Sequence, residues 1–211
     1  MEQVKARRAR YVESTRAALL DTGRRFFAER GYTAVSAEEL VRAAGLTRGA
    51  LYHHFAGKQG LFEAVFENLE AQAAARITAA MDPARTPQEQ AAEGIRAFLE
   101  ICSDPDYREI VLLQGPIALG WQRWRELDQR HLGTILTDRL TALLGDSGPH
   151  PGTHSGPHPG THPGTHPVAL TAAAFYGALT ELALSVADAE DQPKARDQAV
   201  HLITTMLTAL A

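Results

Sequence analysis

Hydrophobic residues recur along this chain at intervals of three and four positions, which is the spacing of one face of an α-helix. Residues 11–30 place Leu19, Phe26 and Phe27 on one stripe, and Gly31 follows as a stop signal. The same spacing predicts helices over about 58–81, 86–102, 104–114, 121–144, 168–188 and 193–210. No stretch alternates convincingly between apolar and polar residues, as a half-buried strand would. The pattern therefore predicts an all-α fold.

Two shorter helices are predicted between residues 36 and 55. Ser36 and Glu39 stand in capping-box spacing at the start of the first helix, and Gly45 ends it. Thr47 caps the second helix, "RGALYHHF", in which Leu51 and Phe55 would anchor the helix from behind. This is the layout of a helix-turn-helix, whose second helix fits the major groove of DNA.

The charge of the chain is unevenly distributed. Residues 1–60 carry 11 Lys and Arg against 6 Asp and Glu, whereas residues 61–211 carry 10 against 19. A cationic end on an acidic body indicates that one end meets a polyanion. Cys102 is the only cysteine, which excludes an intramolecular disulfide and a Cys-based zinc site. The start of the chain leads into no apolar signal-peptide core, and no uninterrupted apolar run approaches the roughly 20 residues of a membrane span. We therefore expect a cytoplasmic protein without a membrane partner.

One segment closely resembles the DNA-binding segment of the tetracycline-repressor (TetR) family of bacterial regulators: "GYTAVSAEELVRAAGLTRGALYHHFAGKQGLF", residues 31–62. Gly31-Tyr32, Ser36, the Ala44–Thr47 turn and "LYHHF" before Gly57-Lys58 carry the resemblance, and Gln59 departs from it where an acidic residue is usual. The resemblance implies an N-terminal three-helix DNA-binding domain at 1–58 and a helical ligand-binding and dimerisation domain at 59–211. It implies DNA contacts at Ser36, Tyr52 and Lys58, on phosphates, and at Thr47, Arg48, Gly49 and His53, near base edges. Arg48 is then the expected guanine reader.

The rest of the chain would complete a regulatory switch. Since one helix-turn-helix covers half a site, we expect a homodimer on a palindromic operator, and the resemblance implies an interface built from the last two helices. It also implies an effector pocket in the middle helices, near the break at "QGPIALG", where Pro116 removes a backbone donor. The candidate lining residues are Phe98, Cys102, Tyr107, Leu113, Gln114, Trp121 and Trp124. Few charges lie among these residues, which favours a largely apolar or aromatic effector. We expect binding of this effector to release the repressor from DNA.

Two other classes of function were weighed against this interpretation. An enzyme is disfavoured, because the chain lacks a nucleophile elbow, a phosphate-binding glycine loop and an HExxH motif, and no cofactor is expected. A metal-responsive regulator is the alternative, based on the repeated "GPHPGTH" of residues 145–167. The candidate ligands there are His150, His154, His158, His162 and His166. Proline and glycine dominate this segment, so we interpret it as a flexible loop between two helices.

Overall fold

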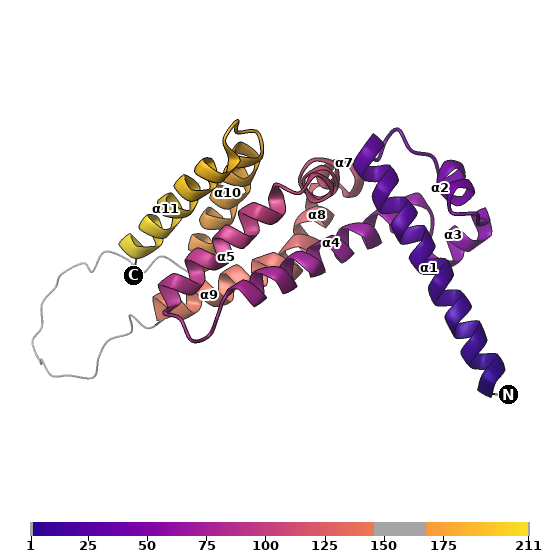
Figure 1. Cartoon of the computed structure of the whole chain (residues 1–211), viewed down its shortest axis with the longest axis horizontal. Coiled ribbons are helices and arrows are strands. Elements are labelled where there is room, and N and C mark those ends of the chain that lie inside the picture. Colours follow the sequence, from indigo (N-terminus) through magenta and orange to yellow (C-terminus); the bar gives the residue numbers. More distant parts are fainter. Residues whose placement is uncertain (1, 146–167, 211) are drawn as a thin grey trace, which may run out of the picture. The chain divides into compact units, whose positions relative to one another are not determined.

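The computed structural model describes residues 2–145 and 168–210, and every regular element in these two ranges is a helix (Figure 1). The predicted all-α fold is therefore confirmed. The chain divides into two compact units. The first comprises Met1–Ala73 and Ile101–Gln129, and the second comprises Ala74–Glu100 and Arg130–Ala211. The boundary predicted after residue 58 falls inside the first unit, and the assignment of functions to 1–58 and 59–211 stays a prediction.

The first unit is built around aromatic side chains. Its elements are α1 (Glu2–Arg30), α2 (Ala37–Ala43), α3 (Arg48–Phe55), most of α4 (Lys58–Ala80), α6 (Pro105–Tyr107), the π-helical η1 (Arg108–Gln114), α7 (Gly115–Leu119) and α8 (Trp121–Asp128). The Phe62 ring lies 5.1 Å from the rings of both Phe27 and Tyr32, in edge-to-face arrangements. This cluster joins α4 to α1 and fixes the base on which α2 and α3 rest.

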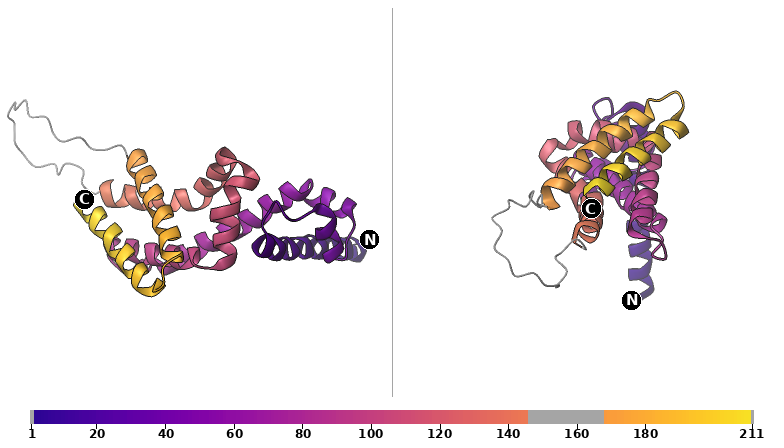
Figure 2. Two further views of the ribbon diagram at one scale, coloured as in Figure 1. Left: turned by 90° about the horizontal axis from the view of Figure 1, so that it is seen from above. Right: turned by 90° about the vertical axis from the view of Figure 1, so that its left-hand side faces the viewer.

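The second unit is a set of longer helices. It contains the end of α4, most of α5 (Pro87–Cys102), most of the π-helical η2 (Gln129–Gly133), α9 (Thr134–Gly145), α10 (Val168–Ala187) and α11 (Gln192–Leu210). Helices α10 and α11 pack side by side, as both views of Figure 2 show. Leu140, Phe175 and Ile203 are buried at the centre of this unit.

The observed helices differ from the predicted ones at three places. The helix predicted over 104–114 is α-helical only in α6 and continues as the π-helical η1. Helix α1 begins at Glu2, well before residue 11, because "EQVKARRAR" has no apolar period but consists largely of strong helix formers. The helix predicted over 121–144 is divided by the π-helical residues of η2. The predicted interruption near Pro116 is confirmed: Pro116 stands in the first turn of α7, and Gly120 ends that helix at a φ of 80°.

Candidate nucleic-acid interface

The start of α2 is fixed by a reciprocal pair of hydrogen bonds. The Ser36 hydroxyl accepts from the Glu39 backbone N–H at 3.2 Å, and a Glu39 carboxylate oxygen accepts from the Ser36 backbone N–H at 2.9 Å. The Ser36 backbone bond, followed by the bond from Arg30, holds the pKa of Glu39 at about 2. The predicted capping box is confirmed, and it sets where the helix-turn-helix begins.

The second helix of the motif is held from one side only. Gly45, at a φ of 66°, turns the chain after α2, and the Thr47 hydroxyl accepts from the Ala50 N–H at 3.3 Å to cap α3. Leu51 is 0% exposed and Phe55 is 7% exposed. The predicted anchoring of α3 through these two side chains is confirmed, which leaves its opposite face open.

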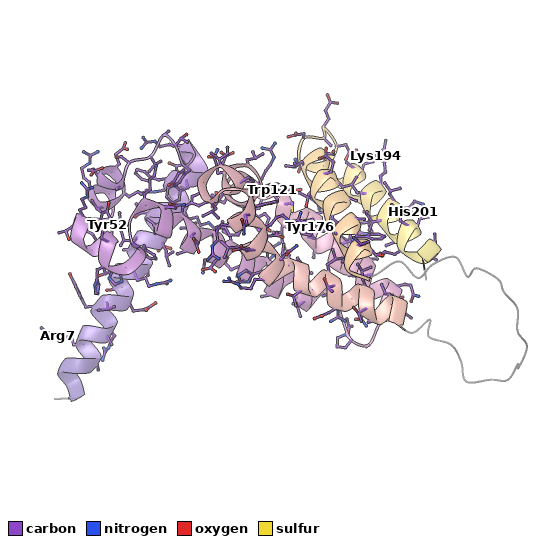
Figure 3. All side chains as sticks on the ribbon, turned by 180° about the vertical axis from the view of Figure 1, so that it is seen from behind. Arg7, Tyr52, Trp121, Tyr176, Lys194 and His201 are labelled. Carbon is purple, nitrogen blue, oxygen red and sulfur yellow. The ribbon has the colours of Figure 1, made fainter. Side chains whose placement is uncertain are left out.

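The open face of α3 holds five of the seven residues that we predict to contact DNA. They are Thr47, Arg48, Gly49, Tyr52 and His53, and all of them are exposed. Tyr52, which is 51% exposed, lies at the outer edge of the first unit in Figure 3. The structure thus gathers these residues on one side of a single short helix, while their contact with DNA stays a prediction.

Arg48 already has partners within the motif. Its Nη1 lies 2.8 Å from the Glu38 carboxylate of α2, and its Nη2 lies 3.5 Å from the Tyr52 hydroxyl. The hydrogen bond to Tyr52 and the negative charge of Glu38 both raise the pKa of Arg48, so the side chain stays cationic. Both members of the Arg48–Glu38 pair are about 60% exposed, which makes the pair easy to exchange for another acceptor.

Gly49 has no packing role among the residues that the structure describes. A Cβ atom added to it would meet no atom closer than the Thr47 hydroxyl oxygen at 3.7 Å, which is ordinary van der Waals contact. Gly60 is different, because its Cβ would lie 1.6 Å from the backbone oxygen of Phe55. Gly60 is therefore needed where α4 passes the end of α3, whereas the missing side chain at Gly49 leaves space for something outside the chain.

The remaining two predicted contacts, Ser36 and Lys58, make internal bonds. The Ser36 hydroxyl also donates to Glu39 at 2.8 Å. The Lys58 ammonium donates to the backbone oxygens of Tyr32 at 3.0 Å and Val35 at 2.9 Å, and it lies 4.0 Å from the centre of the Tyr32 ring. Burial lowers the pKa of Lys58. Sequence reasoning missed this link because its partners lie 23 and 26 positions away.

Six of the seven predicted effector-binding residues belong to the first unit. Gln114 accepts from the Tyr32 backbone N–H at 3.2 Å, and the Trp124 indole donates to the backbone oxygen of Val111 at 3.0 Å. Trp121, which Figure 3 labels, is 62% exposed, and its ring lies 4.9 Å from the Trp124 ring in a tilted arrangement. Cys102 and Tyr107 are buried in the core, and Leu113 is half-buried. Effector binding by these six residues stays a prediction.

Phe98, the seventh, lines a cavity of about 90 Å³ inside the second unit. The cavity wall is almost entirely apolar, and Arg139 is the charged residue that reaches it. Besides Phe98, its principal lining residues are Ile77, Ile95, Leu132, Leu140, Phe175, Tyr176 and Ile203. Helices far apart in the sequence form this wall, and no local sequence signal marks it.

A metal site finds no support in the described part of the chain. Among residues 2–145 and 168–210, no group of three or more His, Cys, Asp or Glu side chains could hold a metal ion. The five histidines of the repeat, His150, His154, His158, His162 and His166, lie outside the described residues. The interpretation of that repeat as a flexible loop falls outside them as well.

Comparison with known families gives consistent results over both halves of the chain. The family profile "Bacterial regulatory proteins, tetR family" matches residues 19–65, and the profile "Tetracyclin repressor-like, C-terminal domain" matches residues 88–148. These families consist of transcriptional regulators, not enzymes. The first match covers α2, α3 and the turn between them, where the exposed residues lie.

Individual relatives agree with the family profiles. The chain is 42% identical over 55 residues to the HTH-type transcriptional regulator AcrR of Shigella flexneri, covering 26% of each chain. It is 30% identical over 121 residues to the transposon Tn10 TetC protein of Escherichia coli, covering 57% of this chain and 60% of that one. These matches therefore span about a quarter and three-fifths of the two curated relatives.

Solved structures extend the likeness to nearly the whole length. A TetR-family transcriptional regulator from Pectobacterium atrosepticum is 34% identical, with a TM-score of 0.69 and 95% of each chain covered. FadR from Bacillus subtilis, solved in complex with stearoyl-CoA, shares the fold at 17% identity and a TM-score of 0.67, covering 92% of this chain and 98% of that one.

Proposed function

The chain belongs to the TetR family of bacterial regulatory proteins, and we propose that it is a homodimeric repressor, bound to a palindromic operator and released by a small-molecule effector. The observation that carries this proposal is the exposed face of α3. Arg48, Gly49 and Tyr52 are exposed there, while Leu51 and Phe55 hold the helix from behind. A helix presented in this way is able to enter a major groove, where an arginine reads guanine by two hydrogen bonds.

The space at Gly49 supports close contact with DNA. None of the described residues requires a residue without a side chain there, so the open space is available to base edges. Glu38 would leave Arg48 when a guanine is bound, because an exposed ion pair is worth only about 0.2–1 kcal/mol. Lys58 would contribute to phosphate binding through the third N–H of its ammonium, since two are already used. The Ser36 hydroxyl has one O–H, so it would have to exchange its bond to Glu39 for a bond to phosphate.

The dimer is supported by apolar surface on α10 and α11. Leu170 is 67% exposed, Leu202 50% and Met206 43%. The stretch Leu170–Ala187 is long and apolar enough to cross a membrane by length and composition, yet only 28% of it is buried in the described chain. Among the described residues, Gly177 has no atom within 4 Å of where its Cβ would be, so its small size serves no packing among them. Two copies of such a helix pair would form a four-helix interface that covers this surface.

The effector would occupy the apolar cavity of the second unit. Its wall offers aromatic and aliphatic side chains, with Tyr176 and Arg139 as the polar groups. Its volume of about 90 Å³ exceeds several-fold the roughly 10–15 Å³ that one water needs, and an apolar wall favours an apolar guest over water. A largely apolar or aromatic effector fits this wall. FadR from Bacillus subtilis, which shares the fold, was solved in complex with stearoyl-CoA, whose acyl chain is apolar.

Release would follow from a shift in population between two arrangements of the dimer. One arrangement spaces the two copies of α3 for successive major grooves, and the effector stabilises another. A coupling of about 1–3 kcal/mol per effector would weaken operator binding roughly 5- to 150-fold.

The DNA-binding half of the proposal is tested by selecting bound duplexes from a random pool. The affinity of the protein for the selected sequence is then measured as a function of salt concentration. We expect a palindromic sequence and a steep fall of affinity with salt, because phosphate contacts release counterions. Arg48→Ala should weaken specific binding by about 1–3 kcal/mol and relax the preference at one base, whereas Arg85→Ala, an exposed arginine of the second unit, should not. Failure to enrich any sequence would contradict the proposal.

The dimer and the effector are tested separately. Leu170→Glu with Leu202→Glu should halve the mass measured by sedimentation and weaken operator binding, since both side chains are exposed in the single chain. Aromatic and aliphatic compounds should then be screened against the protein–operator complex. A compound that fills the cavity, as judged by its loss of binding to Leu140→Trp, and leaves operator affinity unchanged would contradict the switch.

A further inference from the structure

The N-terminal part of α1 is helical but unpacked. Every described side chain from Ala6 to Ser14 is exposed, and Thr15 is the first buried residue of the helix. Figure 1 shows this part of α1 extending beyond α2 and α3 to the N-terminus. We call residues 2–14 the α1 overhang. A helix of that length has only marginal stability in water when nothing packs against it. Contact with another molecule would stabilise the overhang as a helix.

The overhang carries one stripe of cations with an aromatic side chain. Arg7, Arg10 and Tyr11 are spaced by three and four positions, which places them on neighbouring positions of one helix face. All three are exposed, and Tyr11 is 69% exposed. Figure 3 shows Arg7 on the part of α1 that projects from the rest of the first unit. Residues 1–16 hold five Lys and Arg against two Glu, so the surface is cationic as a whole.

The distance of this stripe from α3 indicates where it would lie on DNA that α3 binds. The Arg16 guanidinium lies 5.2 Å from the centre of the Phe55 ring, at the end of α3, and marks where α1 leaves the helix-turn-helix. At 1.5 Å per residue, Arg10 lies about 9 Å and Arg7 about 14 Å further along α1. The DNA major groove is about 12 Å wide. With a recognition helix in the groove, the stripe would therefore lie beyond the groove, over the sugar–phosphate backbone just outside the half-site.

On this basis we propose that the α1 overhang binds the DNA phosphate backbone beside the operator half-site, through Arg7 and Arg10. The inference rests on the proposed DNA binding and adds a second contact surface to it. Guanidinium groups bind phosphate oxygens bidentately, and the Tyr11 hydroxyl is placed to donate a third hydrogen bond. Duplex DNA is the occupant that the charge favours, since the stripe is cationic and lies on the element that supports α3.

The test measures affinity for the selected operator in two duplexes, one trimmed to the site and one carrying about ten further base pairs, one helical turn, on each side. The variant is Arg7→Gln with Arg10→Gln, because glutamine is a good helix former and preserves α1. On the longer duplex the variant should bind roughly 10- to 100-fold more weakly, and its salt slope should fall by about two to four for a dimer. On the trimmed duplex the difference should be small.

Two further variants make the result specific. Arg7→Lys with Arg10→Lys keeps the charge. It should retain most of the affinity, since a phosphate contact does not require the planar guanidinium that reads a guanine with two hydrogen bonds. Arg25→Gln removes one charge from the same helix about 22 Å from Arg10, where the side chain is also exposed, and should leave the salt slope unchanged.

The two possible failures are distinguishable. If the original protein shows no salt-dependent binding to any selected duplex, the proposed function itself is wrong. If the original protein binds and the double glutamine variant binds the longer duplex with the same affinity and slope, only the role of the overhang is overturned. Loss of dimer mass in the variant, with DNA affinity per dimer unchanged, would likewise overturn it and assign the stripe to a second copy of the chain.

Discussion

Arg48 and Glu38 form an ion pair of 2.8 Å across the turn that joins α2 to α3. The pair links the residue that we expect to read guanine to an acidic side chain on the other helix of the motif. In the absence of DNA it occupies the same hydrogen-bonding groups that a guanine would use, so Glu38 competes with the operator for Arg48.

Glu38→Gln should therefore strengthen operator binding. The variant removes both the competitor and a negative charge near the phosphates, and we expect a gain of about two- to fivefold, since exposed pairs are worth roughly 0.2–1 kcal/mol. Equilibrium titration of the selected duplex at fixed salt measures it. Glu29→Gln changes the same charge at an exposed position of α1 and serves as the matched control. A weaker complex for Glu38→Gln would mean that Glu38 itself contacts DNA.

Gly49→Ala should separate stability from DNA binding. Because the added Cβ meets only open space and alanine favours helix, the free energy of unfolding should rise by roughly 0.5–1 kcal/mol. Operator affinity should fall, since the methyl group faces the groove floor. Gly60→Ala is the contrasting variant, and it should destabilise the protein because its Cβ would overlap the Phe55 backbone oxygen. An unchanged affinity for Gly49→Ala would show that α3 does not approach the bases at this point.

Local features of this fold could be predicted from the sequence, because their physical causes are local. The Ser36–Glu39 capping box depends on residues three positions apart, and the burial of Leu51 and Phe55 follows from helical spacing. The start of α1 could not be predicted from apolar spacing, because the described side chains of the overhang face no core and its helix continues through strong helix formers without an apolar period.

The contacts that were missed depend on tertiary packing. Lys58 bonds to carbonyls more than 20 positions away, and the cavity wall combines α4, α5, α9, α10 and α11. An aromatic residue at helical spacing, such as Trp124, gives the same sequence pattern whether its side chain lines a pocket or packs in a core. Only the fold distinguishes the two, and Trp124 bonds within the core of the first unit.

Lys58→Met should reveal a positioning role for the lysine. The variant keeps the length of the side chain but loses both hydrogen bonds to the segment between α1 and α2, at Tyr32 and Val35. We expect the free energy of unfolding to fall by about 1–3 kcal/mol. Thermal or urea unfolding measures it. Lys194→Met, at an exposed position of α11 that Figure 3 labels, is the control and should have little effect. Weaker DNA binding with unchanged stability would instead make Lys58 a phosphate contact alone.

Glu70 makes the stability of the first unit depend on pH. It is 0% exposed, and its Oε1 accepts from the Tyr107 hydroxyl at 2.6 Å, while its Oε2 has no hydrogen-bond partner within the described residues. Burial, followed by the negative charge of Asp128, raises the pKa of Glu70 well above its ordinary value, and the Tyr107 bond opposes this only in part.

Glu70→Gln should therefore stabilise the protein at neutral pH. A carboxyl whose pKa is raised on folding contributes stability that is fully present below about pH 4.3 and is lost as the pH rises through the raised pKa. The glutamine amide can accept from Tyr107 without ever carrying a charge, so the variant should melt at a higher temperature at pH 8 and lose this pH dependence. Melting curves from pH 5 to 9 measure it, with the exposed Glu100→Gln as control. A variant that melts lower throughout this range would show that the carboxylate is satisfied by bonds that the amide cannot make.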